Sequence, residues 1–283
     1  MSRRTIHYKK FVGMFQTVKC AVFSVLLIAM AKNALAQDQY RVVSLESPGI
    51  ITGTIKWSGP MPRSLSLPIT KDKEICDPES RKMRDLERLI VGPNGGVANT
   101  VVFLKHISAG KAFSFPETRR FLDQQHCRYE PHILLVPQDA VLQMKSSDAT
   151  LHTVHMDGAA TFNLPFPFVD QVTSRTMHSA GLVNLRCNGG HIWMNAEMLV
   201  APHPYYAVTD ESGSFELTNV PPGEYEIVAW HEGWGVVGRE AAIDVLTQRR
   251  IVRPVFTEPR TWAKKASVGK SETVVLTFVL ADK

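Results

Sequence analysis

The segment LVNLRCNGGHIWM, residues 182–194, joins a strand-like run to a loop rich in potential metal ligands. The run Leu182–Cys187 is six residues long and mostly apolar, which predicts a β-strand. The eight residues from Cys187 to Met194 then supply one thiolate, one imidazole (His191) and one thioether. A single loop can fold these three groups onto one point. The segment therefore predicts a strand that ends at a cluster of soft and borderline metal ligands.

A second imidazole can join this loop from another part of the chain. His152 and His155 lie on an upstream strand, and two His, one Cys and a weak axial Met form the ligand set of mononuclear blue copper. Positions 152 and 155 of a strand face opposite sides, so both bind one metal only across a bulge. We take His152 as the ligand, with His155 as its replacement or as part of a second, weaker site.

Other metals fit this sequence less well. Structural zinc usually requires paired cysteines, and the chain has no CxxC. A binuclear copper centre needs two bridging cysteines, and an iron–sulfur cluster needs more thiolates still. The structural alternative is that Cys187 is a small buried hydrophobe and Met194 a core residue.

The remaining sequence indicates an all-β protein. Apolar runs of four to eight residues are separated by Gly and Pro at short intervals, and helical signals are scarce. The charged stretch Pro78–Leu89 is the best helix candidate, and Asn94-Gly95-Gly96 predicts a hairpin turn. The expected strands are Ile50–Trp57, Val97–Lys105, His132–Val136, Val141–Lys145, Leu182–Cys187, Met198–Val200, Tyr205–Val208, Ser214–Leu217, Glu224–Trp230, Ala241–Val245 and Thr273–Leu280.

The first 36 residues have the pattern of a secretory signal peptide. A basic stretch to Lys19 precedes a 12-residue apolar stretch and Ala34-Leu35-Ala36, which predicts cleavage after Ala36. These residues hold six of the 32 Lys and Arg and no acidic residue. The rest of the chain has 26 basic and 27 acidic side chains, a formal net charge of −1. This charge disfavours nucleic-acid binding, and we expect a periplasmic or secreted protein without a membrane span after cleavage.

Cleavage would leave Cys76, Cys127 and Cys187. An export compartment permits disulfides, and an odd count leaves one thiol over. Because Cys187 has His191 and Met194 beside it, we expect a Cys76–Cys127 disulfide and a free Cys187.

Several motifs together resemble known families. Ser147–His155, the strand Gly181–Arg186 and the loop Cys187–Met194 resemble a cupredoxin domain. Three more segments resemble exported bacterial proteins that join a cupredoxin-like segment to a carboxypeptidase-regulatory-like (transthyretin-like) β-sandwich. These segments are His203–Asp210, Pro221-Pro222-Gly223 and Trp230-His231-Glu232. Some of those proteins are called methylamine utilization proteins.

The resemblance implies an order of domains. It predicts a signal peptide at 1–36, the first strands of the regulatory-like sandwich at 49–110, a cupredoxin-like Greek-key sandwich at 122–201, and the rest of the regulatory-like sandwich with C-terminal strands at 203–283. The cupredoxin-like sandwich is then inserted in, or packed against, the regulatory-like one.

The loop departs from the family pattern at one point. Short-loop, amicyanin-like cupredoxins have Cys-x-x-His-Pro-x-Met, whereas this chain has Cys-x-x-x-His-x-x-Met, with Ile192 in place of Pro. The additional residue falls within Asn188-Gly189-Gly190, which is flexible enough to bulge. The site then either still closes on copper or is a degenerate copy.

The sequence supports three hypotheses about function. The leading hypothesis is an exported copper protein, with Cys187, His152, His191 and axial Met194 as ligands, which transfers electrons or holds copper for an unknown partner. Trp193 would shield the copper and form an apolar docking rim. The alternative is a metal-free module that binds carbohydrate or protein, with Tyr205, Tyr206, Trp230 and Trp234 as a stacking surface. No hydrolase, P-loop or Rossmann motif is present, so we do not expect an enzyme, apart from a mononuclear copper oxidase.

Overall fold

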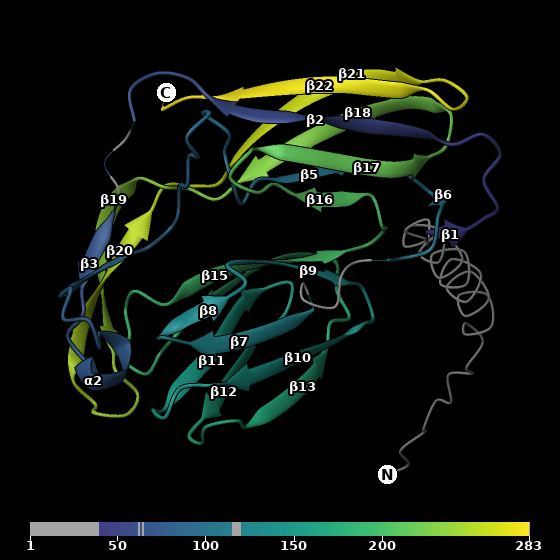
Figure 1. The fold of residues 1–283 in the computed structure, drawn as a ribbon. Helices are drawn as coiled ribbons and strands as arrows, with labels where there is room; N and C mark the ends of the chain where they lie inside the picture. Colours follow the sequence, from purple (N-terminus) through teal and green to yellow (C-terminus); the bar gives the residue numbers. More distant parts are fainter. Residues whose placement is uncertain (1–39, 62, 64, 115–119, 283) are drawn as a thin grey trace, which may run out of the picture. The chain divides into compact units, whose positions relative to one another are not determined.

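A computed structural model describes residues 40–61, 63, 65–114 and 120–282 of the chain (Figure 1). The predicted signal peptide, residues 1–36, lies outside the described residues. Strands make up most of the described chain, and the predicted all-β fold is confirmed. No helix within these ranges is long and apolar enough to cross a membrane.

One sandwich, which we call the inserted sandwich, is built from consecutive strands between residues 121 and 201. One sheet has the order β13-β10-β7-β8 and the other the order β12-β11-β14-β15-β9, with parallel pairing of β7 with β10 and of β9 with β15. The strands are β7 Phe121–Gln125, β8 Arg128–Glu130, β9 Ile133–Pro137, β10 Val141–Ser146, β11 His152–Gly158, β12 Phe162–Phe166, β13 Val172–Thr176, β14 Gly181–Arg186 and β15 Asn195–Ala201.

Alternation of apolar and polar residues decides which side of each sheet is buried. Along β10 the side chains of Leu142 and Met144 are fully buried, while Val141 and Gln143 are exposed. The inward side chains of both sheets join one apolar core, which includes Leu122, Val154 and Leu185. This core extends to Cys187 and Met194, so the candidate ligands lie at its edge.

The second sandwich, the flanking sandwich, takes strands from both sides of the inserted one. Its sheets have the orders β16-β5-β18-β21 and β17-β2-β22, and β2 pairs in parallel with β22. Of the two arrangements that the sequence left open, the strand order shows the insertion of one sandwich between strands of the other. Its strands are β2 Gly49–Trp57, β5 Val101–Leu104, β16 Tyr206–Val208, β17 Ser214–Val220, β18 Gly223–His231, β21 Arg260–Val268 and β22 Thr273–Leu280.

The turn before β17 requires glycine. Gly213 has a φ of +73°, and a Cβ atom there would lie 2.2 Å from the carbonyl oxygen of Ile55. Asp210 closes the same turn by accepting the backbone N–H of Ser212 at 2.9 Å. The Asp-x-x-Gly signal in the sequence thus marks a tight turn between β16 and β17.

The two sandwiches meet at an apolar contact with a buried ionic cluster beside it. Val101 and Trp230 of the flanking sandwich pack with Ile133, Leu135 and Leu199 of the inserted one. Beside them the Glu232 carboxylate, which has no exposed surface, pairs with Arg88 at 2.7 Å and with His132. The contact therefore combines an apolar patch with desolvated charges.

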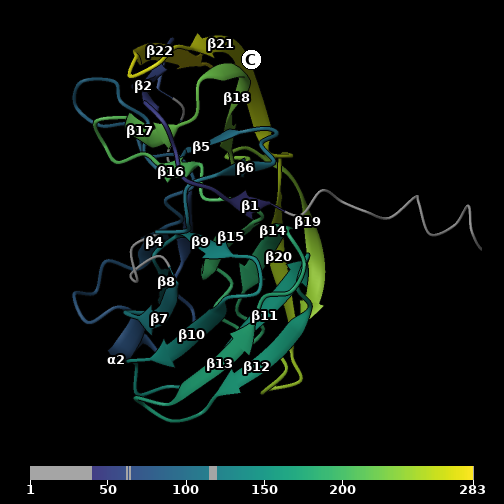
Figure 2. The same cartoon turned by 90° about the vertical axis from the view of Figure 1, so that its right-hand side faces the viewer.

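Two further pairs of strands lie outside both sandwiches, and Figure 2 shows one of them, β19–β20, running alongside the inserted sandwich. One is the β19–β20 hairpin, Val236–Ile243 and Arg250–Phe256, and the other pairs β3 Ser66–Pro68 with β4 Met83–Asp85. Between β3 and β4 lies α2, a single helical turn at Lys73–Cys76. A parallel pair of β1 Arg41–Val42 and β6 Ala109–Gly110 completes the strands.

The helix predicted at Pro78–Leu89 is wrong. The Asp77 carboxylate accepts the backbone N–H groups of Arg81 and Lys82 at 2.7 and 2.8 Å, which bends this segment into a turn. The chain then enters β4, whose Arg84 pairs with Leu67 of β3. Because a local side-chain bond and strand pairing satisfy this backbone, charge density alone was a poor helix signal.

Candidate metal centre

Three predicted ligands come together at one end of the inserted sandwich. His152 opens β11, Cys187 directly follows β14, and His191 lies in the loop after it. The two imidazole Nδ1 atoms are 3.2 Å apart, and Cys187 Sγ lies 3.6 Å from Nδ1 of His191. All three side chains are at most 1% exposed. A ligand nitrogen from each histidine and the thiol sulfur lie within 4.8 Å of one another.

A carboxylate holds the far nitrogen of each imidazole. Nε2 of His152 lies 2.9 Å from Asp148, and Nε2 of His191 lies 2.9 Å from Asp72. An Nε2–H that donates to a carboxylate makes Nδ1 the nitrogen that a metal would bind in exchange for a proton. Both rings are thus oriented with Nδ1 toward Cys187.

Each of these carboxylates is itself held in place. Asp148 accepts the backbone N–H groups of His126 and Cys127 at 2.8 and 2.7 Å. Asp72 accepts the hydroxyl of Thr150 at 2.8 Å. Outer partners of this kind fix the orientation of metal-binding histidines in proteins.

Cys187 is poised as a thiolate. Burial opposes its ionisation, but hydrogen bonds and charge from His152 and His191 outweigh burial and hold its pKa well below the ordinary thiol value. The backbone N–H groups of Thr153 and Gly189 point at the sulfur from 3.5 and 3.3 Å. Burial lowers the pKa of His152, but Asp148 and Cys187 together raise it to about 9.

The loop from Cys187 to Met194 closes on itself despite its additional residue. The Met194 carbonyl accepts the N–H of Cys187 at 3.3 Å, and the Met194 N–H donates to the His191 carbonyl at 3.0 Å. Gly190 adopts a φ of +87°, where a Cβ atom would lie 2.6 Å from an Asp244 carboxylate oxygen. The Gly-Gly pair therefore absorbs the extra residue. Met194 is 1% exposed and packs in the same core as Cys187.

His155 does not join this group. It is half-buried on β11, and its Nε2 lies 3.1 Å from the Arg186 guanidinium. Three residues along a strand place it on the opposite face from His152. Burial and the charge of Arg186 also lower its pKa.

The site is closed, and the predicted docking rim at Trp193 is wrong. Trp193 is 2% exposed, its Nε1–H donates to the Cys127 carbonyl at 3.1 Å, and its ring packs against His191. The edge of His191 faces Asp72 instead of solvent. The segment before α2 thus covers the outer edge of this imidazole.

The β19–β20 hairpin closes the loop from the other side. Arg253 of β20 donates to the carbonyl of Cys187 at 3.0 Å and to the side chain of Asn188 at 2.9 Å. Lys71 donates to the Gly189 carbonyl at 2.6 Å and pairs with Asp244 at 3.1 Å. Two segments distant in sequence thereby fix the ligand loop.

The structure joins Cys76 of α2 to Cys127 of the β7–β8 turn in a disulfide, and Cys187 is the free cysteine of the described residues. Both disulfide sulfurs lie within 4.8 Å of a ring nitrogen of His191. Because they are bonded to each other, they are not available as thiolate ligands.

Sequence reasoning missed Asp72, Asp148 and Arg253. Asp148 lies four residues before His152, and this short spacing could have suggested it as a hydrogen-bond partner of that imidazole. Asp72 and Arg253 have no local signal, since they reach the site only through the tertiary fold. Arg253 lies in the basic stretch Arg249–Arg253, yet its side chain is only 7% exposed.

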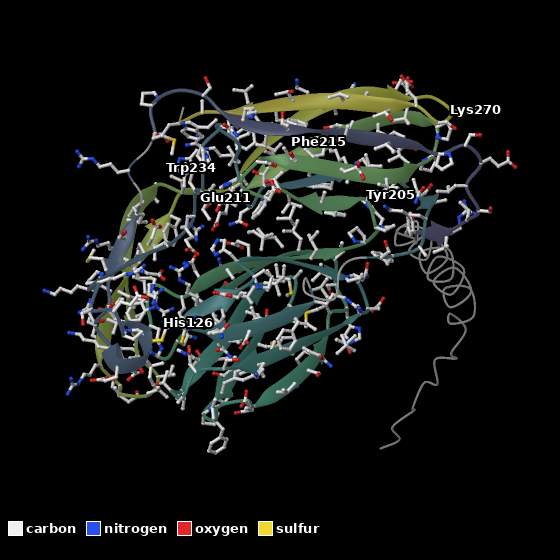
Figure 3. The ribbon with its side chains drawn as sticks, in the orientation of Figure 1. His126, Tyr205, Glu211, Phe215, Trp234 and Lys270 are labelled. Carbon is white, nitrogen blue, oxygen red and sulfur yellow. A yellow bond between two sulfur atoms is a disulfide. The ribbon has the colours of Figure 1, made fainter. Side chains whose placement is uncertain are left out.

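The aromatic residues proposed as a stacking surface are turned inward or toward one another. Tyr205, Trp230 and Trp234 are at most 8% exposed, and the half-buried Tyr206 stacks on Phe103. Figure 3 shows Tyr205 and Trp234 at opposite ends of the flanking sandwich. The stacking surface for carbohydrate is therefore not formed by these residues.

His203 and His231 are packing residues. His203 is 4% exposed, accepts the Tyr205 N–H at 3.3 Å and packs against Tyr206 with the two rings tilted by 36°. His231 has no exposed surface, and its Nδ1 lies 2.8 Å from the Glu232 carbonyl.

Comparisons with known proteins cover parts of the chain. Residues 204–256 match the model of the BOS complex subunit NOMO1-like second β-sandwich domain. No curated protein sequence matches the chain. The likeness to methylamine utilization proteins stays a prediction.

Similar solved structures are copper proteins. A point mutant of amicyanin in its reduced Cu(I) form is 25% identical over 29% of this chain and 80% of its own, with a TM-score of 0.27. A purple cupredoxin from Nitrosopumilus maritimus is 18% identical over 26% of this chain and 81% of its own (TM-score 0.24). The copper nitrite reductase of Thermus scotoductus SA-01 is 14% identical over 35% of this chain and 25% of its own (TM-score 0.28). With such low TM-scores, these likenesses carry no functional conclusion.

Proposed function

We propose that this protein is an exported copper-holding protein with one mononuclear centre. His152 and His191 would bind through Nδ1 and Cys187 through Sγ, with Met194 as a weak fourth ligand. The observation that carries the proposal is the convergence of two Nδ1 atoms and a buried cysteine sulfur, each imidazole being held from behind by a carboxylate.

The donor set fits copper. Thiolate and thioether suit Cu(I), imidazole suits both oxidation states, and copper held by this set supplies one-electron chemistry. A structural zinc site would usually have four strong ligands, and a thioether is not one of them. The N–H groups of Thr153 and Gly189 at the sulfur would tune its donor strength.

The closed site favours holding copper over passing electrons through an exposed ligand. His191 has no exposed surface, and Asp72 covers its outer nitrogen. An electron-transfer partner could not contact that imidazole while this cover is in place. Release or transfer of the metal would require the same cover to move.

A metal-free binding module remains the second candidate, because a β-sandwich family model matches residues 204–256. With its aromatic residues packed inward, the flanking sandwich would then bind protein rather than carbohydrate.

The proposed export agrees with the signal-like leader and with the Cys76–Cys127 disulfide. We propose no catalytic role.

A competition assay tests the proposal. The purified metal-free protein would be titrated with Cu(I) against a coloured chelator, in parallel with Cys187→Ala and His155→Ala. The proposal expects one copper per chain in the wild type and in His155→Ala, and none in Cys187→Ala. Equal binding by the wild type and Cys187→Ala would refute it, and the binding-module hypothesis would take its place.

A further inference from the structure

A covalent bond ties the cover of the site to the inserted sandwich. Asp72, which contacts His191, directly precedes α2, and Cys76 ends that single helical turn. Cys76 is bonded to Cys127 in the β7–β8 turn, 51 residues away in sequence. The disulfide thus anchors the segment 71–76, which we call the cap.

The same bond lies between the supports of both imidazoles. The N–H of Cys127 donates to Asp148 at 2.7 Å, and Asp148 holds His152. On the other side, the N–H of Cys76 donates to the carbonyl of Asp72 at 2.8 Å. One S–S bond therefore links the two elements that orient His152 and His191.

Besides the disulfide, the cap is held by polar contacts of Lys71 and Asp72 and by packing of Ile75 against the core of the inserted sandwich. A helix of four residues is not stable by itself, and Asp72 at its start has left-handed backbone angles. The side chains of Lys71 and Asp72 are 21% and 31% exposed, so water competes for their ion pairs. The disulfide is the one covalent link among the contacts described for the cap.

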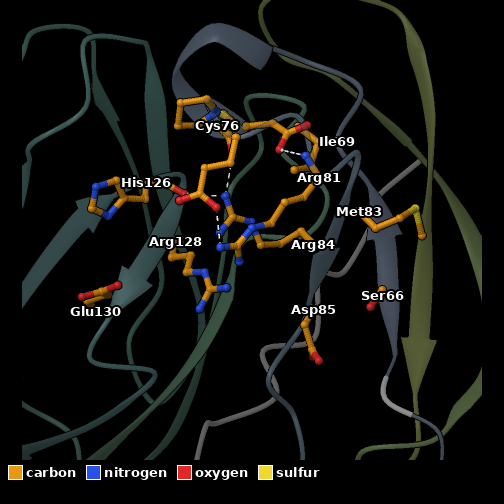
Figure 4. Close-up of a pocket in the computed structure, with 13 residues that line it drawn as sticks. Ser66, Ile69, Cys76, Arg81, Met83, Arg84, Asp85, His126, Arg128 and Glu130 are labelled. Atoms are coloured by element: carbon orange, nitrogen blue, oxygen red, sulfur yellow. Dashed lines mark hydrogen bonds and ion pairs between the residues drawn. The ribbon is translucent and has the colours of Figure 1, made fainter.

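A cavity of about 450 Å³ opens on the outer side of this bond (Figure 4). Its lining includes Cys76, His126, Arg84 and Arg128. Arg84 donates through Nη2 to the carbonyls of Cys76 and of His126, the residue before Cys127, so its positive charge lies beside the disulfide. Cationic surroundings stabilise a departing thiolate and favour thiol–disulfide exchange.

We propose that Cys76–Cys127 is a reducible latch on the metal centre, opened by a dithiol protein of the export compartment; this inference rests on the proposed copper site. Both half-cystines are buried, so exchange begins when the short cap moves at the cavity wall. A thiolate of the reductant attacks one sulfur, the S–S bond breaks, and the other cysteine leaves as a thiolate that takes up a proton.

The second thiol of the reductant then resolves the mixed disulfide. The reductant ends as a disulfide, and Cys76 and Cys127 end as thiols, after a transfer of two electrons and two protons. The freed cap withdraws Asp72 from His191 and opens the way to Cys187 for loading or release of the metal.

The latch is tested on the metal-free protein by the accessibility of Cys187. N-ethylmaleimide labelling followed by mass spectrometry would compare the wild type with Cys76→Ser/Cys127→Ser. Leu217→Ala, which creates a cavity in the core of the flanking sandwich, is the control for general destabilisation. We expect Cys187 to be labelled at least about tenfold faster in the double variant, and at the wild-type rate in Leu217→Ala. Protection of Cys187 in a folded double variant would overturn the latch.

A second measurement covers a double variant that fails to fold. The wild type would be treated with limited dithiothreitol and alkylated, while near-ultraviolet circular dichroism monitors folding. The latch predicts labelling of Cys76, Cys127 and Cys187 while the fold persists, and labelling only on global unfolding would overturn it. Because neither readout uses copper, failure of the latch and failure of the copper proposal are distinguishable.

Discussion

His152 and His191 are 39 residues apart in sequence, yet their Nδ1 atoms lie 3.2 Å apart beside Cys187. This relationship depends on Asp148 and Asp72, which hold the opposite nitrogen of each ring. The two carboxylates come from different parts of the fold, so the site is assembled by tertiary structure rather than by one motif.

Replacement of the carboxylate behind His152 should weaken copper binding without removing a ligand. We expect Asp148→Asn to lower the Cu(I) affinity by about 10- to 100-fold, because the imidazole loses its orientation and part of its basicity. Chelator competition measures the effect. Asp139→Asn is the matched control, since Asp139 is exposed and pairs with the exposed His178. An unchanged affinity in Asp148→Asn would show that this carboxylate has no such role.

Metal binding should stabilise the folded protein. Copper that binds only the native state, at a free concentration about 1,000 times its Kd, adds about 4 kcal/mol to the free energy of unfolding. Thermal unfolding would show a raised Tm that a copper chelator returns to the metal-free value. Cys187→Ala should show no rise, and a rise of equal size in that variant would point to copper bound elsewhere.

Stability should fall in mild acid because of His203. Burial lowers its pKa to about 4, whereas the unfolded chain has a value near 6.5. As pH falls through this window the unfolded state binds the proton first, so stability present above pH 6.5 is progressively lost down to about pH 4. Between pH 7.5 and 5 this residue should cost about 2 kcal/mol. Urea unfolding of the wild type and His203→Gln at both pH values measures it, and identical pH dependence would contradict the assignment.

The buried ionic cluster between the sandwiches should be sensitive to loss of one partner. Arg88→Met leaves the Glu232 carboxylate, which has no exposed surface, without its guanidinium at 2.7 Å. We expect a loss of about 3–5 kcal/mol in the free energy of unfolding. Lys105→Met, which breaks an exposed pair with Glu226, should cost at most about 1 kcal/mol. Similar losses in the two variants would show that burial of the cluster is unimportant.

Local sequence predicted the strand that ends at Cys187 and much less of what surrounds the site. The run before Cys187, the Asp-x-x-Gly turn and the soft-ligand loop each have a signal within a few residues. Asp72 and Arg253 have none, because Asp72 reaches His191 across 119 residues and Arg253 reaches Cys187 across 66. Burial of Trp193 was missed for the same reason, since the elements that cover it are distant in sequence.

The most direct test is a Cu(II) titration of the metal-free protein, followed by visible absorption and electron paramagnetic resonance. The proposed site predicts an intense thiolate-to-copper charge-transfer band that saturates at one copper per chain and is absent in Cys187→Ala. A folded wild-type protein that stays colourless, or whose spectrum is unchanged in Cys187→Ala, would contradict the account.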